Sequence, residues 1–304
     1  MKPFQATSGD LTADRRADFA EMLYASGEPA AAAELLLGAL ELAPQWAAGW
    51  FRLGEMHEAA APDKAAQAWT MALTLEPTDR LGAALKLQLI GKAPSARAPP
   101  SAFVEMLFDH YAESFEESLV DKLGYRLPDF LDQAVRRARP GRFRLVLDLG
   151  CGTGLMGQRL RPVADRLEGY DISAAMLKKA RAKGVYDLLA KADLQDFSYA
   201  GRKADLVVAA DVFIYVGALE RVIGRIAGLL AGDGLFAFSV ETLVGEGGFA
   251  LQPSRRYAHS HAYVGQVLAA NGFSVLSMDP TVIRLDRSQP VEGLAVVAAL
   301  PANT

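Results

Sequence analysis

The chain has 304 residues, enough for two domains, and its 51% hydrophobic and 22% charged residues are typical of a folded globular protein rather than a disordered or fibrous one. The formal net charge of −4 argues against the broad basic surface of a nucleic-acid-binding protein, and no apolar run reaches the ~20 residues that a membrane span needs. Cys151 is the only cysteine, so no intrachain disulfide can form, and no signal peptide is evident. These features predict a cytoplasmic protein that binds neither nucleic acid nor membrane.

Residues 1–97 are rich in Ala and Leu at helical spacing, so we expect an all-helical domain. A weak repeat runs through it at a spacing of 33 residues, with Ala32, Ala39 and Pro44 in the first unit and Ala65, Ala72 and Pro77 in the second. With Trp50, Leu53 and Gly54 in the second unit, the pattern resembles the tetratricopeptide repeat (TPR), in which small residues lie where paired helices cross. The resemblance implies either a groove for a protein partner, or a packing module that helps to form a homodimer or shields the next domain.

Residues 98–140 are predicted to form a linker and a helical lid. A proline-rich joint interrupts the preceding helices, and a new helix begins near Ser101. Phe108, Tyr111 and Phe115 fall on one face of this segment. An aromatic stripe can pack in a core or cover a ligand, and its place shortly before the glycine turn described below would let it fold over that turn.

From residue 141 to residue 304, strand and helix patterns alternate, which predicts a parallel sheet with helices on both faces. Strands are expected at 144–149, 166–171, 186–191, 204–210, 234–240, 273–279 and 294–300. No helix pattern separates the last two strands, so we expect them to form an antiparallel hairpin at one edge of a seven-stranded sheet.

The first of these strands ends at Asp148 and breaks into Gly150, Gly152 and Gly154 before a helix begins. Such a turn brings bare backbone and a helix N-terminus to one point, which suits a polar ligand. With Gly157 the glycines also fit the fingerprint of dinucleotide-binding proteins, so a nicotinamide-dependent oxidoreductase is one alternative. Asp148, however, places a carboxylate where a pyrophosphate would lie, and the final hairpin does not belong to that class. A carboxylate here favours a cationic cofactor without phosphate.

The run from Leu147 to Gly154 resembles motif I of the class I S-adenosylmethionine-dependent methyltransferases, and the later strand ends follow the order of that family. The resemblance covers about residues 100–300. It implies an α/β fold with a Rossmann-like seven-stranded sheet and an antiparallel last strand, preceded here by the TPR-like helical domain. Together with the repeats, the chain resembles a bacterial group of predicted methyltransferases with N-terminal tetratricopeptide repeats. The implied cofactor is S-adenosylmethionine, with S-adenosylhomocysteine as product.

By this resemblance, the cofactor lies over the ends of the first four strands. Asp171, at the end of the second strand, would accept both ribose hydroxyls, and Asp193 would accept a hydrogen bond from the adenine amine. The other implied cofactor contacts are Asp148, Gly150, Cys151, Gly152, Ile172, Met176, Leu194, Ala210, Tyr111 and Phe115.

The acceptor would arrive over the ends of the fourth and fifth strands, where a long glycine-rich loop follows the fifth strand. Phe213, Arg255 and Tyr257 are its predicted contacts. Arg255 and its neighbour Arg256 could bind a carboxylate or a phosphate on the acceptor, although exposed arginines are common. Tyr215 follows Phe213 at the end of the fourth strand and is one of two catalytic candidates.

His259 is the second catalytic candidate, because methyl transfer from a sulfonium needs a general base only when the nucleophile is protonated. It could equally be a capping or surface residue at the start of the following helix. No Cys/His spacing typical of zinc is present, so we expect no metal.

The predicted activity is methyl transfer to an unidentified acceptor, with a small molecule as the leading choice. The alternatives are a binding or scaffold protein whose repeats recruit a partner, and a protein methyltransferase whose repeats deliver a protein substrate.

Overall fold

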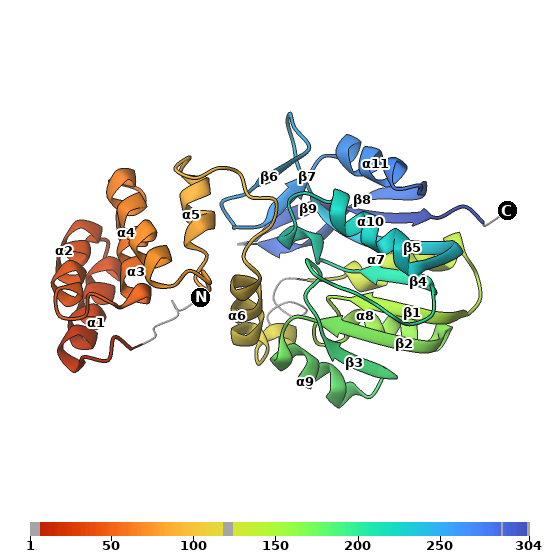
Figure 1. Cartoon of the computed structure of the whole chain (residues 1–304), viewed down its shortest axis with the longest axis horizontal. Helices are drawn as coiled ribbons and strands as arrows, with labels where there is room; N and C mark the ends of the chain where they lie inside the picture. Colours follow the sequence, from red (N-terminus) through yellow and green to blue (C-terminus); the bar gives the residue numbers. More distant parts are fainter. Residues whose placement is uncertain (1–6, 118–123, 287, 303–304) are drawn as a thin grey trace. The chain divides into compact units, whose positions relative to one another are not determined.

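The computed structural model of the chain describes residues 7–117, 124–286 and 288–302 (Figure 1). The chain divides into two compact units, Met1–Phe103 and Val104–Thr304. Part of the segment predicted as a lid, residues 118–123, lies outside the described residues. Within the described ranges, no helix is long and apolar enough to cross a membrane.

The N-terminal unit consists of helices in which neighbours along the chain pack on one another (Figure 1). The prediction of a helical N-terminal region is therefore confirmed. Its helices are α1 (Leu11–Ala25), α2 (Pro29–Leu40), α3 (Ala47–His57), α4 (Pro62–Leu75) and α5 (Ala83–Leu89).

Small residues line the helix crossings of this unit. A Cβ on Gly54 would lie 2.3 Å from Nε1 of Trp69, so the indole of α4 fits only against a glycine of α3. That Nε1–H donates a 3.1 Å hydrogen bond to the carbonyl of Phe51. The alanines of the predicted repeat are at most 3% exposed: Ala32, Ala39, Ala65 and Ala72. This packing suits a helical repeat, and the assignment to the tetratricopeptide class stays a prediction.

The C-terminal unit contains a mixed sheet whose parallel strands lie in the order β3-β2-β1-β4-β5. Strand β9 pairs antiparallel with β5, and β8 pairs antiparallel with β9 at the edge. The predicted antiparallel hairpin is therefore confirmed. The strands are β1 (Phe143–Leu149), β2 (Ala164–Asp171), β3 (Leu188–Lys191), β4 (Ala204–Ala209), β5 (Leu230–Thr242), β6 (Phe249–Leu251), β7 (Tyr257–His259), β8 (Ser274–Asp286) and β9 (Gln289–Ala299).

Two cores lie on opposite faces of this sheet, because successive side chains of a strand alternate between its faces. Leu145 and Leu147 of β1 join the core that includes helices α10 and α11, whereas Val146 joins the core that includes α7 and α8. The helices of this unit are α6 (Ser101–Tyr111), which begins before the unit boundary, α7 (Leu127–Ala138), α8 (Leu155–Leu160), α9 (Ala174–Lys183), α10 (Glu220–Leu229) and α11 (His261–Ala270). The described residues of this unit also include two single turns of 3-10 helix, η2 (Arg161–Val163) and η3 (Phe213–Tyr215).

The segment after β5 differs from the expected loop. Strands β6 and β7 pair antiparallel, and β7 pairs with the last residues of β5, Glu241 and Thr242. Each of the two strands has three residues, too few to give an alternating pattern in the sequence. The short β6–β7 hairpin therefore extends the sheet at the carboxyl end of β5, where the acceptor was expected.

Candidate active site

The glycine turn is tied to the carboxyl ends of two neighbouring strands. The amides of Gly150 and Cys151 both donate to the carbonyl of Tyr170 in β2, at 2.7 and 3.0 Å. A Cβ on Gly150 would lie 2.5 Å from Cγ2 of Val212, which follows β4. Gly150 also has a φ of 68°, so both backbone conformation and space require glycine at this point.

Asp171 lies at the end of β2 and faces this turn. Its Oδ2 accepts a hydrogen bond from the amide of Gly152, and its Oδ1 accepts one from the amide of Ser173, each at 2.8 Å. The side chain is 8% exposed, and burial raises its pKa to about 6 while the backbone hydrogen bonds act in the opposite direction. A carboxylate has about four lone-pair sites, more than its backbone hydrogen bonds occupy here, so Asp171 can still accept from a hydroxyl group.

Asp148 lies at the end of β1 and is 1% exposed. Its Oδ2 accepts a 2.6 Å hydrogen bond from the hydroxyl of Tyr186, while its Oδ1 has no partner among the described residues. Burial raises the pKa of Asp148 to about 7. A buried polar atom without a partner costs free energy unless a ligand satisfies it. These two carboxylates and the bare backbone between them fit a cofactor that carries hydroxyl groups and a positive charge.

The residues predicted to contact the adenine, together with the other predicted cofactor contacts, differ in how exposed their side chains are. Asp193 follows β3, is partly exposed, and accepts a 2.8 Å hydrogen bond from the amide of Gln195. Ile172 and Leu194 are partly exposed, as are Ala210 after β4 and the lid residues Tyr111 and Phe115. Met176 is completely buried, so its predicted contact with adenine does not fit its position.

Helix α6 is fastened next to Asp171, a feature that we did not predict. Oδ1 of Asp109 accepts from the hydroxyl of Ser173 at 2.6 Å and from the amide of Ala175 at 3.2 Å, both at the start of α9. Three more acidic residues of this segment pair with lysines of α9 and β3: Glu105 with Lys191, Glu113 with Lys179, and Glu116 with Lys183. The spacing of these acids, three or four residues apart, was the signal in the sequence.

Aromatic rings connect α6 with η3, the single turn that follows β4. The rings of Phe108 and Tyr215 meet edge to face, with centroids 5.3 Å apart, and Phe115 lies 6.3 Å from Phe108. Because Asp109 next to Phe108 holds Ser173 after β2, α6 links the predicted ribose side to the predicted acceptor side. Tyr215 is therefore the member of η3 that faces the expected acceptor region.

Two predicted acceptor contacts do not fit their positions. Phe213 is completely buried and packs in the core with Phe236 and Phe238, at centroid distances of 6.1 and 5.3 Å. Tyr257 is also completely buried, with its ring 6.1 Å from that of Phe249 across the β6–β7 hairpin. Neither side chain can contact an acceptor from these places. Arg255 is partly exposed in the turn of this hairpin, with a φ of 62°.

The prediction that His259 acts as a general base is also corrected by its position. The side chain is completely buried, and its Nε2 lies 2.9 Å from the carbonyl oxygens of both Val216 and Gly217. Both carbonyls can only accept, so Nε2 carries the proton and donates. Burial lowers the pKa of His259 to about 4, and the carbonyls oppose this effect only in part. This histidine fixes the β7 strand to the chain after η3.

A buried charge network lies between the ends of β4, β5 and β8. Nη1 of Arg284 lies 2.9 and 2.8 Å from the two carboxylate oxygens of Asp211, and its Nη2 bonds to Glu241. Arg284 is 3% exposed, so its charge is balanced by these two carboxylates rather than by water. Arg256 lies nearby, with Nη1 3.6 Å from Asp286 and a side chain that is 27% exposed.

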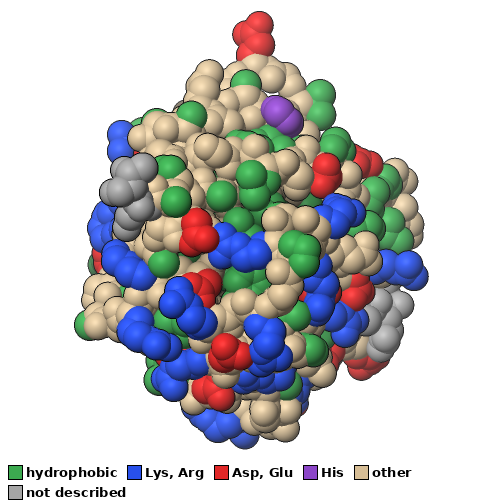
Figure 2. All heavy atoms as spheres, turned by 90° about the vertical axis from the view of Figure 1, so that its right-hand side faces the viewer, with side chains coloured by type: hydrophobic (Ala, Val, Ile, Leu, Met, Phe, Trp, Pro, Cys, Tyr) green, Lys and Arg blue, Asp and Glu red, His purple; other side chains and the backbone are tan. Residues whose placement is uncertain are grey.

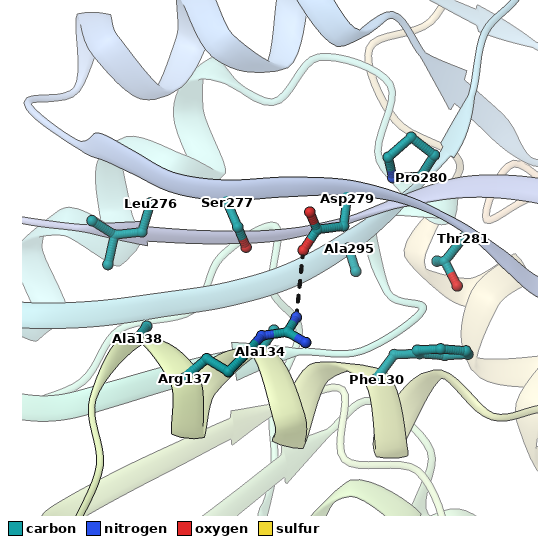
Figure 3. A pocket seen from close by; sticks show the side chains of 10 residues that line it. All are labelled: Phe130, Ala134, Arg137, Ala138, Leu276, Ser277, Asp279, Pro280, Thr281 and Ala295. Atoms are coloured by element: carbon teal, nitrogen blue, oxygen red, sulfur yellow. Dashed lines mark ion pairs between the residues drawn. The ribbon is translucent and has the colours of Figure 1, made fainter.

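A separate groove of about 590 Å³ lies between α7 and the edge strand β8 (Figure 3). Phe130 and Leu276 line its apolar part, and Arg137 pairs with Asp279 across it at 3.6 Å. None of the predicted site residues lines this groove. The groove lies beside the β8–β9 hairpin rather than at the carboxyl ends of the parallel strands.

Basic side chains gather on part of one face of the molecule, with acidic side chains among them (Figure 2). The arginine-rich stretch that ends α7 and begins β1 is ion-paired throughout: Arg136 with Asp132, Arg137 with Asp279, Arg139 with Asp233, Arg142 with Asp165, and Arg144 with Asp205. These pairs balance the positive charge of the stretch. In the part of the chain that the structure describes, no group of three or more His, Cys, Asp or Glu side chains could hold a metal ion.

Comparisons with known proteins agree with this geometry. A family model described as a methyltransferase domain matches residues 147–238, from the glycine turn into β5. Over 165 residues, the chain is 30% identical to Synechocystis sp. magnesium-protoporphyrin O-methyltransferase. This match covers 49% of this chain and 71% of that protein. The chain is 28% identical over 199 residues to malonyl-(acyl-carrier protein) O-methyltransferase of Legionella pneumophila, covering 59% of this chain and 65% of that one.

Among solved structures, the cyclase SpnF matches 69% of this chain and 100% of its own, with a TM-score of 0.57 and 15% identity. At that identity the likeness concerns the fold alone. The matched part spans about two thirds of the length of the two curated relatives.

Proposed function

Because this chain belongs to the class I S-adenosylmethionine-dependent methyltransferases, we propose that it transfers the methyl group of this cofactor to an oxygen atom of a small-molecule acceptor. The observation that carries the proposal is the glycine turn held between two buried carboxylates, Asp148 and Asp171. The choice of oxygen is supported by the two curated relatives described above, which are both O-methyltransferases by name.

S-adenosylmethionine supplies a methyl group that its sulfonium has already activated. In our proposal Asp171 accepts the ribose hydroxyls, Asp148 faces the cationic methionine end, and Asp193 accepts from the adenine amine. The backbone of the turn at Gly150 and Gly152 lies close to the cofactor because neither residue has a side chain in the way. The chain's main task is then to align the acceptor atom with the methyl group, and such alignment is worth up to ~7–11 kcal/mol of the barrier.

The acceptor side favours a nucleophile that is already ionised. His259 is buried, its Nε2 bonds to two carbonyls, and its low pKa keeps it neutral, so it cannot reach an acceptor proton. A carboxylate has lost its proton at neutral pH and needs no base. We therefore propose a carboxylate-bearing acceptor that becomes a methyl ester.

Arg256 is the side chain that we assign to orient this carboxylate. The guanidinium of Arg284 is already matched by Asp211 and Glu241. Arg256 hydrogen-bonds to the hydroxyl of Tyr215, and its ion pair with the half-exposed Asp286 is long, at 3.6 Å. Burial acts to lower the pKa of Arg256, but the nearby Tyr215 and Glu241 raise it overall, so it stays charged. A flat acceptor could pack against Tyr215 and Phe108 while its carboxylate reaches Arg256.

The test is a transfer assay with methyl-labelled S-adenosylmethionine and the full chain, using extracts and a panel of small carboxylic acids. We expect labelled products whose label is released as volatile methanol by mild alkali, because methyl esters hydrolyse and methyl ethers or N-methyl groups do not. Asp171→Ala serves as the inactive control. Alkali-stable label on small molecules would contradict the carboxylate, and label on proteins would favour the alternative in which the helical repeats deliver a protein substrate.

A further inference from the structure

Tyr186 lies between α9 and β3 and reaches the glycine turn through its side chain. The strand that the sequence predicted from residue 186 begins only at Leu188, so Tyr186 belongs to the connection that follows Gly184. Its hydroxyl donates the 2.6 Å hydrogen bond to Oδ2 of Asp148. The ring thus connects a loop between α9 and β3 to the carboxylate at the end of β1.

Three glycines leave the space that this ring occupies. A Cβ on Gly157 would lie 2.2 Å from the hydroxyl oxygen of Tyr186, one on Gly169 2.9 Å from its Cε1, and one on Gly154 3.1 Å from its Cε2. Gly154 has a positive φ, but Gly157 and Gly169 do not, so their backbone conformations do not require glycine. The space that Tyr186 occupies requires glycine at Gly157, and Tyr186 together with Leu189 requires it at Gly169. Gly157 is the third glycine of the pattern that fits the dinucleotide-binding fingerprint. It is therefore explained by the packing of Tyr186 and not by a dinucleotide.

The hydrogen bond from Tyr186 leaves Asp148 with one unsatisfied oxygen. The carboxylate is 1% exposed, and Oδ1 has no hydrogen-bond partner among the described residues. The ionisable groups that interact with it are Tyr186, Asp171, Cys151 and Tyr125. None of these four is a cation, so among the described residues no ionisable partner supplies a positive charge beside Oδ1, and a cationic ligand can. S-adenosylmethionine carries an ammonium group that can supply it.

We propose that Tyr186 is a positioning residue for the cofactor, which holds Oδ2 of Asp148 so that Oδ1 receives the ammonium of the methionine end. This inference rests on the assignment of Asp148 to the cofactor. A hydroxyl that donates to a carboxylate also favours its ionised form. Tyr186 therefore orients Asp148 and keeps it negative for a cationic ligand.

The pH dependence of binding separates this role from simple packing. Burial raises the pKa of Asp148 to about 7, and the hydrogen bond from Tyr186 acts in the opposite direction. Removing the hydroxyl raises that pKa further, so more of the carboxyl group is neutral at pH 7. The affinity for a cationic ligand should then fall at neutral pH and recover as the pH rises.

The experiment is calorimetry of S-adenosylhomocysteine, which carries the same ammonium group, with the full chain between pH 6 and pH 9. We expect Tyr186→Phe to bind about tenfold more weakly at pH 7, with most of the loss regained at pH 9. Tyr199→Phe is the matched control, because it also removes a hydroxyl that donates to a carboxylate, that of Glu168. Its pH profile should match that of the wild-type chain.

A double variant decides whether the effect passes through Asp148. In an Asp148→Asn background, Tyr186→Phe should cause no further pH-dependent loss. If Tyr186→Phe does not fold, Gly157→Ala displaces the same hydroxyl without removing it and should shift the profile in the same direction. A loss that is equal at every pH, or that persists beside Asp148→Asn, overturns the proposal. Because the assay needs no acceptor, failure of the proposed methyl acceptor would not affect it.

Discussion

Arg284 of β8 and Asp211 after β4 are 73 residues apart in the chain, yet Nη1 of the arginine contacts both carboxylate oxygens, at 2.9 and 2.8 Å. Glu241 at the end of β5 completes the contact. The edge hairpin is thereby fixed to the same strand ends that carry the proposed site. Asp211 has a φ of 58°, a conformation that is uncommon for residues other than glycine, and the ion pair holds it there.

We expect Arg284→Met to destabilise the chain by about 3–5 kcal/mol, because it leaves the buried Glu241 and the partly buried Asp211 without a counter-charge. Urea denaturation at pH 7 measures the change. Arg137→Met is the matched control: the Arg137 side chain is 68% exposed and its pair with Asp279 spans 3.6 Å, so it should cost less than about 1 kcal/mol. Equal effects of the two substitutions would show that the network does not hold the hairpin.

The fastening of α6 to α9 should control how quickly the cofactor leaves. Glu113 and Lys179 form one of its exposed ion pairs, so we expect Glu113→Lys to accelerate the release of S-adenosylhomocysteine, and high salt to do the same to the wild-type chain. The charge-swapped double variant, Glu113→Lys with Lys179→Glu, should restore slow release. Stopped-flow displacement measures these rates, and a double variant as fast as the single one would mean that the pair has no part in retention.

The buried Asp148 should make the cofactor-free chain less stable as the pH rises. Its folded pKa of about 7 lies above the ordinary value of 3.8, so the unfolded chain ionises first, and stability falls between about pH 4 and pH 7. Asp148→Asn removes this effect and should raise stability at pH 8 by roughly 4 kcal/mol while it weakens cofactor binding. Thermal unfolding at pH 4 and pH 8 makes the comparison. A variant that is less stable at both pH values would contradict this view of Asp148.

His259 should matter for stability rather than for catalysis. Its folded pKa of about 4 lies below the ordinary value of 6.5, so the unfolded chain binds the proton first, and stability is lost as the pH falls from about 6.5 to 4. We expect His259→Gln to lower the melting temperature but to change kcat by less than about threefold, because the ring contacts carbonyls and not the acceptor. A hundredfold loss of kcat in a folded variant would restore His259 as the base.

Much of the fold was predictable from local patterns. The alternation of strand and helix patterns predicted the parallel sheet. The absence of a helix pattern between the last two predicted strands predicted the antiparallel hairpin. The glycine turn was visible because its special backbone conformations need a residue type that stands out, as at Gly150 and Gly154. The short carboxylates Asp148 and Asp171 were found because a parallel strand delivers its last residues to one edge of the sheet.

The remaining site residues depend on contacts between distant segments. Phe213, Tyr257 and His259 were expected near the acceptor because they follow strand ends. Phe213, in η3, instead packs into the core against Phe236 and Phe238, and the β6–β7 hairpin buries Tyr257 and His259. That pairing involves only three residues in each strand and leaves no pattern. Tyr186 lies in a segment predicted as ordinary strand, and Arg284 lies between two predicted strands. Their roles arise from partners that are 38 and 73 residues away.

The central claim is that the glycine turn and its carboxylates bind S-adenosylmethionine, and calorimetry of S-adenosylhomocysteine with the wild-type chain and Asp171→Ala tests it most directly. Asp171→Asn, which keeps the shape of the side chain, separates loss of charge from local rearrangement. Saturable binding to the wild-type chain, weakened by about a hundredfold or more in Asp171→Ala, is the predicted result. Equal affinity in the two proteins would contradict the assignment of this site.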